Sequence, residues 1–255
     1  MHTPNTSFNH VNYLWNEEKA AQLEGNEVDL FLYRSNLLGA DLRITNYGGG
    51  NTSCKTKELD PLTKTWVEVM WIKGSGGDIG TMTRSGLAGL YVDKLNALKG
   101  IYRGLEHEDE MVGLFGHCLY DLDSKAPSID TPLHGFLPFK HIDHLHPDAA
   151  IAIAAAKDGE EITKTLWKGT IAWVPWQRPG FDLGLKLRAA LDQNPGIRGI
   201  MLGGHGLFTW GDTSYECYLN SLEVIETASA YLAENYGKKR PVFGGQKINS
   251  LDPDQ

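Results

Sequence analysis

The sequence predicts an α/β protein with a single domain, in which helices cover a mostly antiparallel sheet. Three observations lead to this fold class. Segments with helical and with strand-like spacing are mixed along the 255 residues without a strict β–α–β alternation, and no linker or repeat divides them. Apolar residues make up 41% of the chain, which excludes a disordered protein, and a chain of this length buries one sizeable core.

The first half of the chain is expected to contain one clear helix and two strands. Asn26 is a good N-cap and Gly39 a good stop for a helix over residues 26–38. The alternating, β-branched stretch 65–72 predicts a strand, and a shorter strand is expected at 51–57. Apolar spacing further predicts two helices, at residues 87–101 and 108–119.

The second half is expected to alternate short strands and helices. Residues 125–138 carry three prolines and predict turns with one short helix. Strands are expected at residues 140–146, 170–174, 197–202 and 207–210. Helices are expected from Pro147 to 157, over residues 181–192, and from an N-cap at Asp212 to about residue 235.

The chain divides into three expected parts. Residues 1–25 are a polar, loosely held N-terminal extension, and residues 26–240 form the domain. Residues 241–255 are a C-terminal tail, compatible with truncation before a further domain.

Charge and composition exclude several functional classes. The net charge of −8 gives no electrostatic footprint for nucleic acid. The longest apolar run, residues 149–156, falls far short of the roughly 20 residues that a membrane helix needs. Three widely spaced cysteines without a CxxC pair, and no apolar leader, favour free thiols in a cytoplasmic protein.

The histidines are the most informative feature of the sequence. His144 and His146 are two residues apart at the end of a predicted strand, so both side chains lie on one face. His205, between glycines after another predicted strand, is the best third donor. Three neutral imidazoles with an open fourth position are the ligand set of a catalytic zinc ion. The same spacing also fits ordinary strand histidines and other three-histidine chemistries, such as that of a hydrating zinc enzyme.

Two further kinds of segment carry polar groups suited to a sugar phosphate. Asp130, in a proline-bounded turn, is a candidate general acid or base, and its alternative role is a helix N-cap. The glycine-rich segments 48–53 and 73–78 can offer backbone amides to a phosphate, although each also reads as a plain β-turn. Lys73 could add positive charge, but we favour a solvated strand end for it.

Taken together, these segments resemble the class II aldolase/adducin family. The glycine-rich turns, the serine-to-carboxylate segment 128–130, the His-Leu-His run and the Gly-His-Gly turn follow one another in that family's order over residues 26–235. More narrowly, several runs are similar to the aldolase part of bifunctional rhamnulose-1-phosphate aldolase/short-chain dehydrogenase proteins. These runs are residues 33–39, 71–78, 104–110 and 175–180.

The resemblance implies a fold and a site. The fold is an α/β/α sandwich with nine strands, commonly assembled as a tetramer with active sites near the subunit interfaces. The implied metal is Zn²⁺, or another divalent ion, and the implied catalytic carboxylate falls on Asp130. The implied zinc ligands are His144, His146 and His205, and the implied phosphate-binding residues are Asn51, Ser75, Gly76 and Ser128.

Two positions depart from the family pattern. Asp130 is one methylene shorter than the family's glutamate, and Ile129 replaces a second serine that binds phosphate in fuculose-type aldolases. The expected function is a zinc-dependent aldolase that cleaves a ketose 1-phosphate, with L-rhamnulose 1-phosphate as the first choice, to dihydroxyacetone phosphate and L-lactaldehyde. The alternatives are a ketopentose-phosphate 4-epimerase, a non-catalytic adducin-like interaction module, and an inactive fragment.

Overall fold

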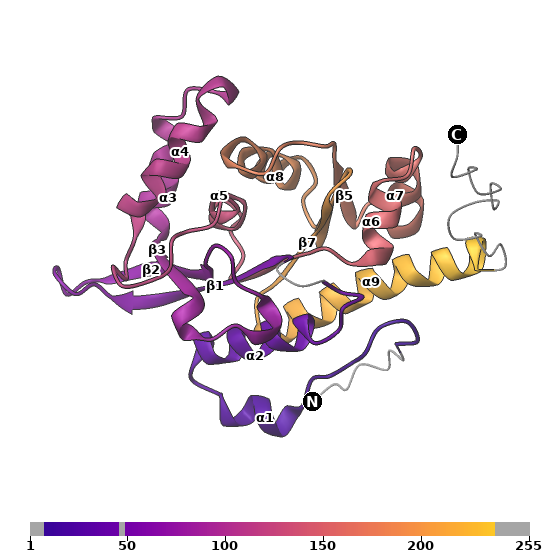
Figure 1. Ribbon diagram of the computed structural model, residues 1–255, viewed down its shortest axis with the longest axis horizontal. Helices are drawn as coiled ribbons and strands as arrows, with labels where there is room; N and C mark the ends of the chain where they lie inside the picture. The colour runs from indigo at the N-terminus through magenta and orange to yellow at the C-terminus, as the bar shows by residue number, and fades with distance from the viewer. Residues whose placement is uncertain (1–7, 46–48, 238–255) are drawn as a thin grey trace, which may run out of the picture.

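A computed structural model describes residues 8–45 and 49–237, which form one seven-stranded sheet covered by helices (Figure 1). The strand order is β3-β2-β1-β4-β7-β6-β5. Every neighbouring pair is antiparallel except β5 and β6, which confirms the mostly antiparallel sheet. The described residues hold seven strands rather than the nine that the resemblance implied.

The strands are short except for the first hairpin, β1 and β2. Their bounds are β1 Asn51–Leu59, β2 Trp66–Lys73, β3 Leu87–Tyr91, β4 His141–Leu145, β5 Ile171–Val174, β6 Gly199–Leu202 and β7 Gly206–Gly211. The main helices are α1 Glu17–Gln22, α2 Glu27–Gly39, α3 Val92–Ala97, α4 Glu108–Leu114, α5 Thr131–Gly135, α6 Asp148–Ala154, α7 Gly159–Trp167, α8 Phe181–Gln193 and α9 Ser214–Tyr236. No helix in the described ranges is long and apolar enough to cross a membrane.

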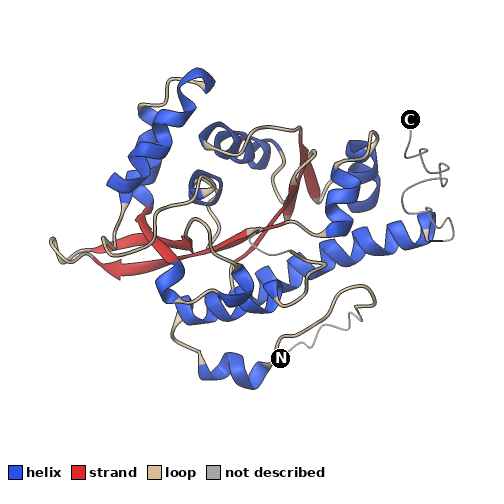
Figure 2. Cartoon of the chain, in the orientation of Figure 1, coloured by secondary structure: helices blue, strands red, loops and turns tan. Residues whose placement is uncertain are grey.

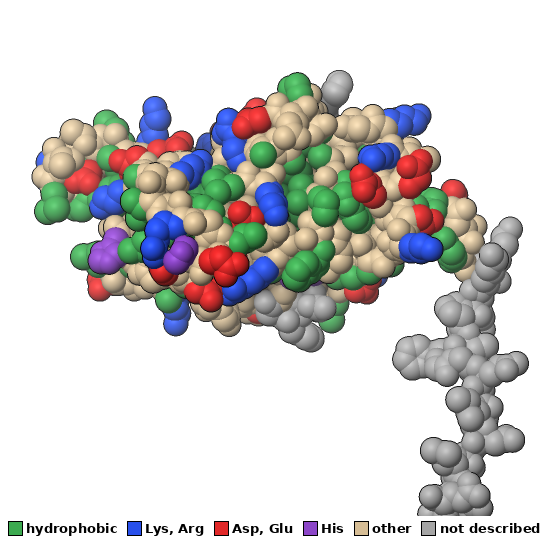
Figure 3. Space-filling view, turned by 90° about the horizontal axis from the view of Figure 1, so that it is seen from above, with side chains coloured by type: hydrophobic (Ala, Val, Ile, Leu, Met, Phe, Trp, Pro, Cys, Tyr) green, Lys and Arg blue, Asp and Glu red, His purple; other side chains and the backbone are tan. Residues whose placement is uncertain are grey.

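The helices form two layers (Figure 2). Helices α2 and α9 lie against one face of the sheet, where Thr52 of β1 contacts Ser35 of α2 and Thr209 of β7 contacts Ser221 of α9. Helices α3, α5 and α8 lie on the other face. Their side chains pack there with those of the strands in two apolar clusters. Acidic and basic side chains are interspersed on the face of the molecule that Figure 3 shows, with apolar side chains between them.

Two predicted elements differ from the structure. Residues 87–101, expected as one helix, begin instead as β3, because Leu87–Tyr91 pairs with the edge of β2. Gly89 packs there under the ring of Trp71, where a Cβ atom would approach a ring carbon to 2.8 Å. The N-cap of α9 is Thr213 rather than Asp212, since Thr213 and Glu216 form a capping box.

The N-terminal extension is not loosely held over its described part. Trp15 is buried in the main core, and its ring lies 5.0 Å from Tyr215 of α9. The backbone amides of residues 9–11 donate to the carboxylate of Glu226 in the same helix. Residues 1–7 and the predicted tail 241–255 lie outside the described residues.

The side chains of strand β4 point alternately to the two faces of the sheet. Residues alternate in direction along a strand, so His144 and Asp143 point to opposite sides. His144 lies opposite Asn51 of β1 and Phe208 of β7. These pairs place the imidazole on the α5 and α8 side, at the end of the sheet where the predicted site residues gather.

Candidate metal centre

The three predicted histidines converge at the end of β4. His144 is the fourth residue of that strand, His146 follows its last residue, and His205 lies in the turn between β6 and β7. Because β4 and β7 pair antiparallel, the end of one lies beside the start of the other. One ligand atom from each imidazole lies within 4.8 Å of the other two. Among the described residues, these three histidines form a group of side chains that could hold a metal ion.

The ring nitrogens are placed as metal ligands require. Nε2 of His144 and Nε2 of His146 are 3.1 Å apart. Two nitrogens on a tetrahedral zinc ion at 2.0–2.1 Å would be separated by about 3.3 Å. Nδ1 of His144 lies 3.2 Å from the carbonyl oxygen of Leu207, so an Nδ1–H donor there leaves Nε2 free to bind a metal. The donor set therefore fits a divalent metal ion.

The surroundings hold the imidazole of His144 in place. Phe208 stacks on its ring with centroids 4.3 Å apart and planes 11° from parallel. Gly206 leaves room for the rings, because a Cβ atom there would lie 2.8 Å from Cδ2 of His146. The stacking of Phe208 and the small size of Gly206 thus allow the imidazoles to lie close together at this turn.

Burial keeps the three imidazoles neutral. It lowers the pKa of His144 well below its ordinary value, with the two neighbouring imidazoles adding to the effect. Burial also lowers the pKa of His146 to about 4, and it lowers that of His205, where the nearby Asp130 carboxylate opposes the shift. Neutral imidazoles are the form that binds metal.

Asp130 lies beside this centre at the N-cap position of α5. Its side chain makes no capping hydrogen bond to the helix. Burial raises its pKa, while Asn51, His205, Lys73 and Ser128 favour the charged form. The carboxyl group is thus available to the site, although the sequence allowed a purely structural cap.

Lys73, which we expected to be a solvated strand end, is buried near Asp130. It ends β2, is only 5% exposed, and its Nζ donates to the carbonyl of Gly77 at 2.8 Å. Burial lowers its pKa, and the charges of Asp130 and Asp78 oppose that shift. One feature of the sequence could have indicated that Lys73 belongs near the site. It lies at the end of a predicted strand, directly before the glycine-rich turn.

The four predicted phosphate-binding residues lie in three segments near Asp130. Asn51 is 1% exposed, and its side-chain amide lies close enough to the Asp130 carboxylate to favour the charged form, although neither of its polar atoms makes a well-aligned hydrogen bond. Ser128 contacts Asp130 through its hydroxyl, 3.4 Å from Oδ2. Ser75 and Gly76 lie exposed in the turn after β2. The buried Asn51 amide therefore keeps polar atoms that are not fully used within the protein.

The structure corrects one expectation about the turn after β2. The backbone amide of Ser75 donates to the carbonyl of Ala126, and that of Gly74 donates to Gly86. These two amides are therefore used within the fold and are not donors for a phosphate. The hydroxyl of Ser75 and the neighbouring ammonium of Lys73 are the groups that this end of β2 offers instead.

Trp176 borders the His205 turn. A Cβ atom on Gly204, whose φ is +65°, would lie 3.2 Å from Cδ1 of the indole, and Trp176 is nevertheless 68% exposed. The adjacent Trp173 is only half-buried and packs against Gly203. An exposed aromatic ring thus lies next to His205, one of the three clustered histidines.

Comparison with known proteins identifies relatives along almost all of the chain. Residues 32–232 match the family model described as the class II aldolase and adducin N-terminal domain. The chain is also 41% identical over 245 residues to a Bacillus subtilis protein described as the uncharacterized oxidoreductase YuxG. That match covers 96% of this chain and 35% of the relative, so the chain spans about a third of the relative's length.

Solved structures share the fold. The N-terminal class II aldolase domain of a conserved protein from Thermoplasma acidophilum is 30% identical, with a TM-score of 0.78, over 87% of this chain and 99% of that domain. L-fuculose-1-phosphate aldolase from Thermus thermophilus is 17% identical, with a TM-score of 0.54, over 86% of this chain and 98% of that enzyme. At this identity the second likeness concerns the fold alone.

Proposed function

Because this chain belongs to the class II aldolase and adducin family, we propose that it is a zinc-dependent aldolase acting on a ketose 1-phosphate. The first-choice substrate is L-rhamnulose 1-phosphate, with dihydroxyacetone phosphate and L-lactaldehyde as products. The observation that carries the proposal is the convergence of three neutral imidazoles on one point. A binding module with the same fold has no need of such a cluster.

The metal and the substrate phosphate have separate places in this proposal. A divalent ion held by His144, His146 and His205 supplies a Lewis acid for the negative charge that develops as the C3–C4 bond breaks. Neutral ligands suit this task because they leave the full charge of the ion in place. The phosphate is assigned to Asn51, Ser75, Gly76 and Ser128, with Lys73 as the nearby cation.

Asp130 is the proposed proton carrier. Its raised pKa increases the protonated fraction near neutrality, so that it can deliver a proton to the carbon released by cleavage. Lys73 and Asn51 limit that rise in pKa, because both favour the charged form of the carboxyl group. The shorter side chain compared with the family's glutamate is offset by placing Asp130 at the start of α5, close to His205.

The aldehyde half is assigned to the side of the centre that Trp176 borders. Its exposed indole offers an apolar surface for the methyl group of L-lactaldehyde. We also propose that the protein is cytoplasmic and acts as a homo-oligomer, a tetramer by family resemblance, with a small sugar phosphate as its partner molecule.

The test combines metal analysis with a cleavage assay. Wild-type protein purified without chelator should carry about one zinc ion per chain and release dihydroxyacetone phosphate from L-rhamnulose 1-phosphate. His146→Ala should lose both, because one of the three ligands is gone, whereas exposed His117→Ala should keep both. Formation of an epimeric ketose phosphate without free aldehyde would identify a 4-epimerase instead. Absence of metal, with no gain on adding zinc, would contradict the metal-dependent reaction.

A further inference from the structure

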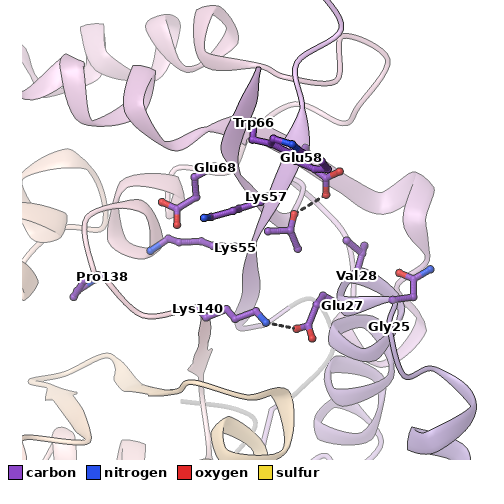
Figure 4. Close-up of a pocket in the computed structure, with 12 residues that line it drawn as sticks. Gly25, Glu27, Val28, Lys55, Lys57, Glu58, Trp66, Glu68, Pro138 and Lys140 are labelled. Atoms are coloured by element: carbon purple, nitrogen blue, oxygen red, sulfur yellow. Dashed lines mark hydrogen bonds and ion pairs between the residues drawn. The ribbon is translucent and has the colours of Figure 1, made fainter. Parts of the chain in front are cut away.

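A second cavity lies at the open edge of β1, away from the candidate metal centre. β1 pairs with β2 along residues 53–59, but its ladder with β4 covers only Asn51–Cys54 and one further hydrogen bond, from the amide of Lys55 to the carbonyl of Lys140. Beyond that point the β4 side of β1 is uncovered. A cavity of about 660 Å³ fills this gap, between β1, β2 and the start of α2 (Figure 4). Its size is typical of small-molecule sites.

Lysines dominate one wall of this cavity. Lys55 and Lys57 are two residues apart, so they share one face of β1, and Figure 4 shows both extending the same way beside Glu68. Lys140 turns to the other side, where its Nζ lies 2.9 Å from Glu27. Three carboxylates line the cavity: Glu27 is paired with Lys140, Glu58 accepts from Thr56 at 2.7 Å, and Glu68 lies on the wall of the two lysines (Figure 4).

Lys55 is a buried cation that forms no direct ion pair within the described part of the chain, although Glu68 lies on the same wall. It is 6% exposed, its ammonium donates to the carbonyl of Leu137, and among the described residues neither Lys55 nor Lys57 forms an ion pair. Burial lowers the pKa of Lys55 to about 8; Glu68 opposes this shift, and the positive charges of Lys99 and Arg188 add to it. A buried charge normally requires a partner of opposite sign.

The backbone adds a donor at the same place. Alternate residues of an antiparallel strand direct their amides to the same neighbour. Because the amide of Lys55 points to β4, that of Lys57 points to the uncovered edge. Edge lysines also discourage strand pairing, which accounts for the exposed Lys57 but not for the buried Lys55.

We propose that this cavity binds a small organic anion, whose phosphate or carboxylate group pairs with Lys55 and Lys57. The 72% exposed indole of Trp66 at the rim offers a flat apolar surface for the rest of the molecule. The site is separate from the metal centre: Asn51 and Lys55 are four residues apart on β1, about 13 Å at the rise of a strand. The inference does not rest on the proposed aldolase activity.

The experiment is an amide NMR titration of the metal-loaded full chain with inorganic phosphate and, separately, with succinate at fixed ionic strength. Saturable shifts are expected at the amides of Lys57 and Glu58 and at the indole of Trp66. Because shifts are resolved by residue, anion binding near Asn51 is distinguished from binding at this cavity. The anion that saturates the shifts at the lower concentration, phosphate or succinate, shows whether the cavity prefers a phosphate or a carboxylate group.

Two variants make the test decisive. Lys55→Met keeps the side-chain volume and should weaken binding by about tenfold or more, as expected for loss of a charge-assisted hydrogen bond. Exposed Lys57→Met should weaken it severalfold and serves if Lys55→Met does not fold. Lys157→Met, at an exposed position elsewhere, is the matched control and should bind normally. Saturation by neither anion, or equal affinity in wild type and both cavity variants, overturns the proposal.

Discussion

Asp143 and His144 are neighbours on β4, yet they belong to opposite kinds of polar environment. On the α2 and α9 side, Asp143 pairs with Arg34, 3.0 Å away, and both side chains are fully buried. The second carboxylate oxygen accepts from Ser221 at 2.9 Å and from Cys217 at 3.2 Å. Every strong polar group of this cluster is therefore directed at another part of the protein.

On the α5 side, the polar groups are only partly satisfied by one another. His144 and His146 bring two ring nitrogens to 3.1 Å, and neither polar atom of Asn51 makes a well-aligned hydrogen bond. One of these rings can donate to the other, and a bound cation would take the place of the shared proton. The comparison shows how to distinguish a structural polar cluster from a binding site: the first is complete in itself, and the second lacks a component.

The largest expected effect comes from breaking the complete cluster. Asp143→Ala leaves the buried Arg34 without a counter-charge and should lower the free energy of unfolding by about 3–5 kcal/mol. Urea unfolding measures it. The matched control is the exposed pair of Arg178 and Asp109, where Asp109→Ala should cost about 1 kcal/mol or less. Equal losses at the two positions would contradict the role given to burial.

Removing the Asp130 carboxyl group from the candidate metal centre should lower activity and leave stability nearly unchanged. Asp130→Asn keeps the shape but removes the proton-carrying carboxyl, so kcat for cleavage should fall by about 10²–10⁴-fold. Thermal unfolding should change little, because the side chain makes no helix-capping bond. The exposed Asp123→Asn is the control and should retain full kcat. A large loss of stability with unchanged kcat would make Asp130 a structural residue.

The third effect is the smallest within a single pH unit, and it sharpens the comparison through the dependence of stability on pH. His141 lies on the Asp143 side of β4, and burial, aided by Arg34 and Lys140, lowers its pKa to about 2. Below pH about 6.5 the unfolded chain binds a proton at this residue that the folded chain does not. Stability is thus complete above that pH, and it falls as the pH drops from about 6.5 toward 2, by about 1.4 kcal/mol per pH unit for this one group.

The measurement is urea unfolding of metal-free protein at several pH values below 6.5. His141→Gln should reduce the dependence of stability on pH by the share of one histidine. The exposed His117 is the matched control, and His117→Gln should leave the dependence unchanged. Identical pH profiles for the wild type and His141→Gln would show that His141 contributes nothing to acid sensitivity.

The sequence by itself determined the features that depend on local chemistry. The N-cap of α2 at Asn26, the strand at whose end His144 and His146 lie, and the turn that holds the glycine-flanked His205 are at the predicted positions. Caps, strand alternation and tight turns involve residues a few positions apart, so the pattern of neighbours is enough to recognise them.

Only the tertiary structure decided the roles of residues whose partners are distant in the chain. Glu108 is an acidic residue in the first turn of α4, a position that is commonly solvated, but it is buried and accepts the amide of Asp182 at the start of α8. Lys73 is buried beside Asp130, and Leu87–Tyr91 is a strand because β2 offers an edge. A charged side chain is solvated or buried according to what packs over it, and an edge strand forms only where another strand supplies hydrogen bonds. Neither partner is visible in the local sequence.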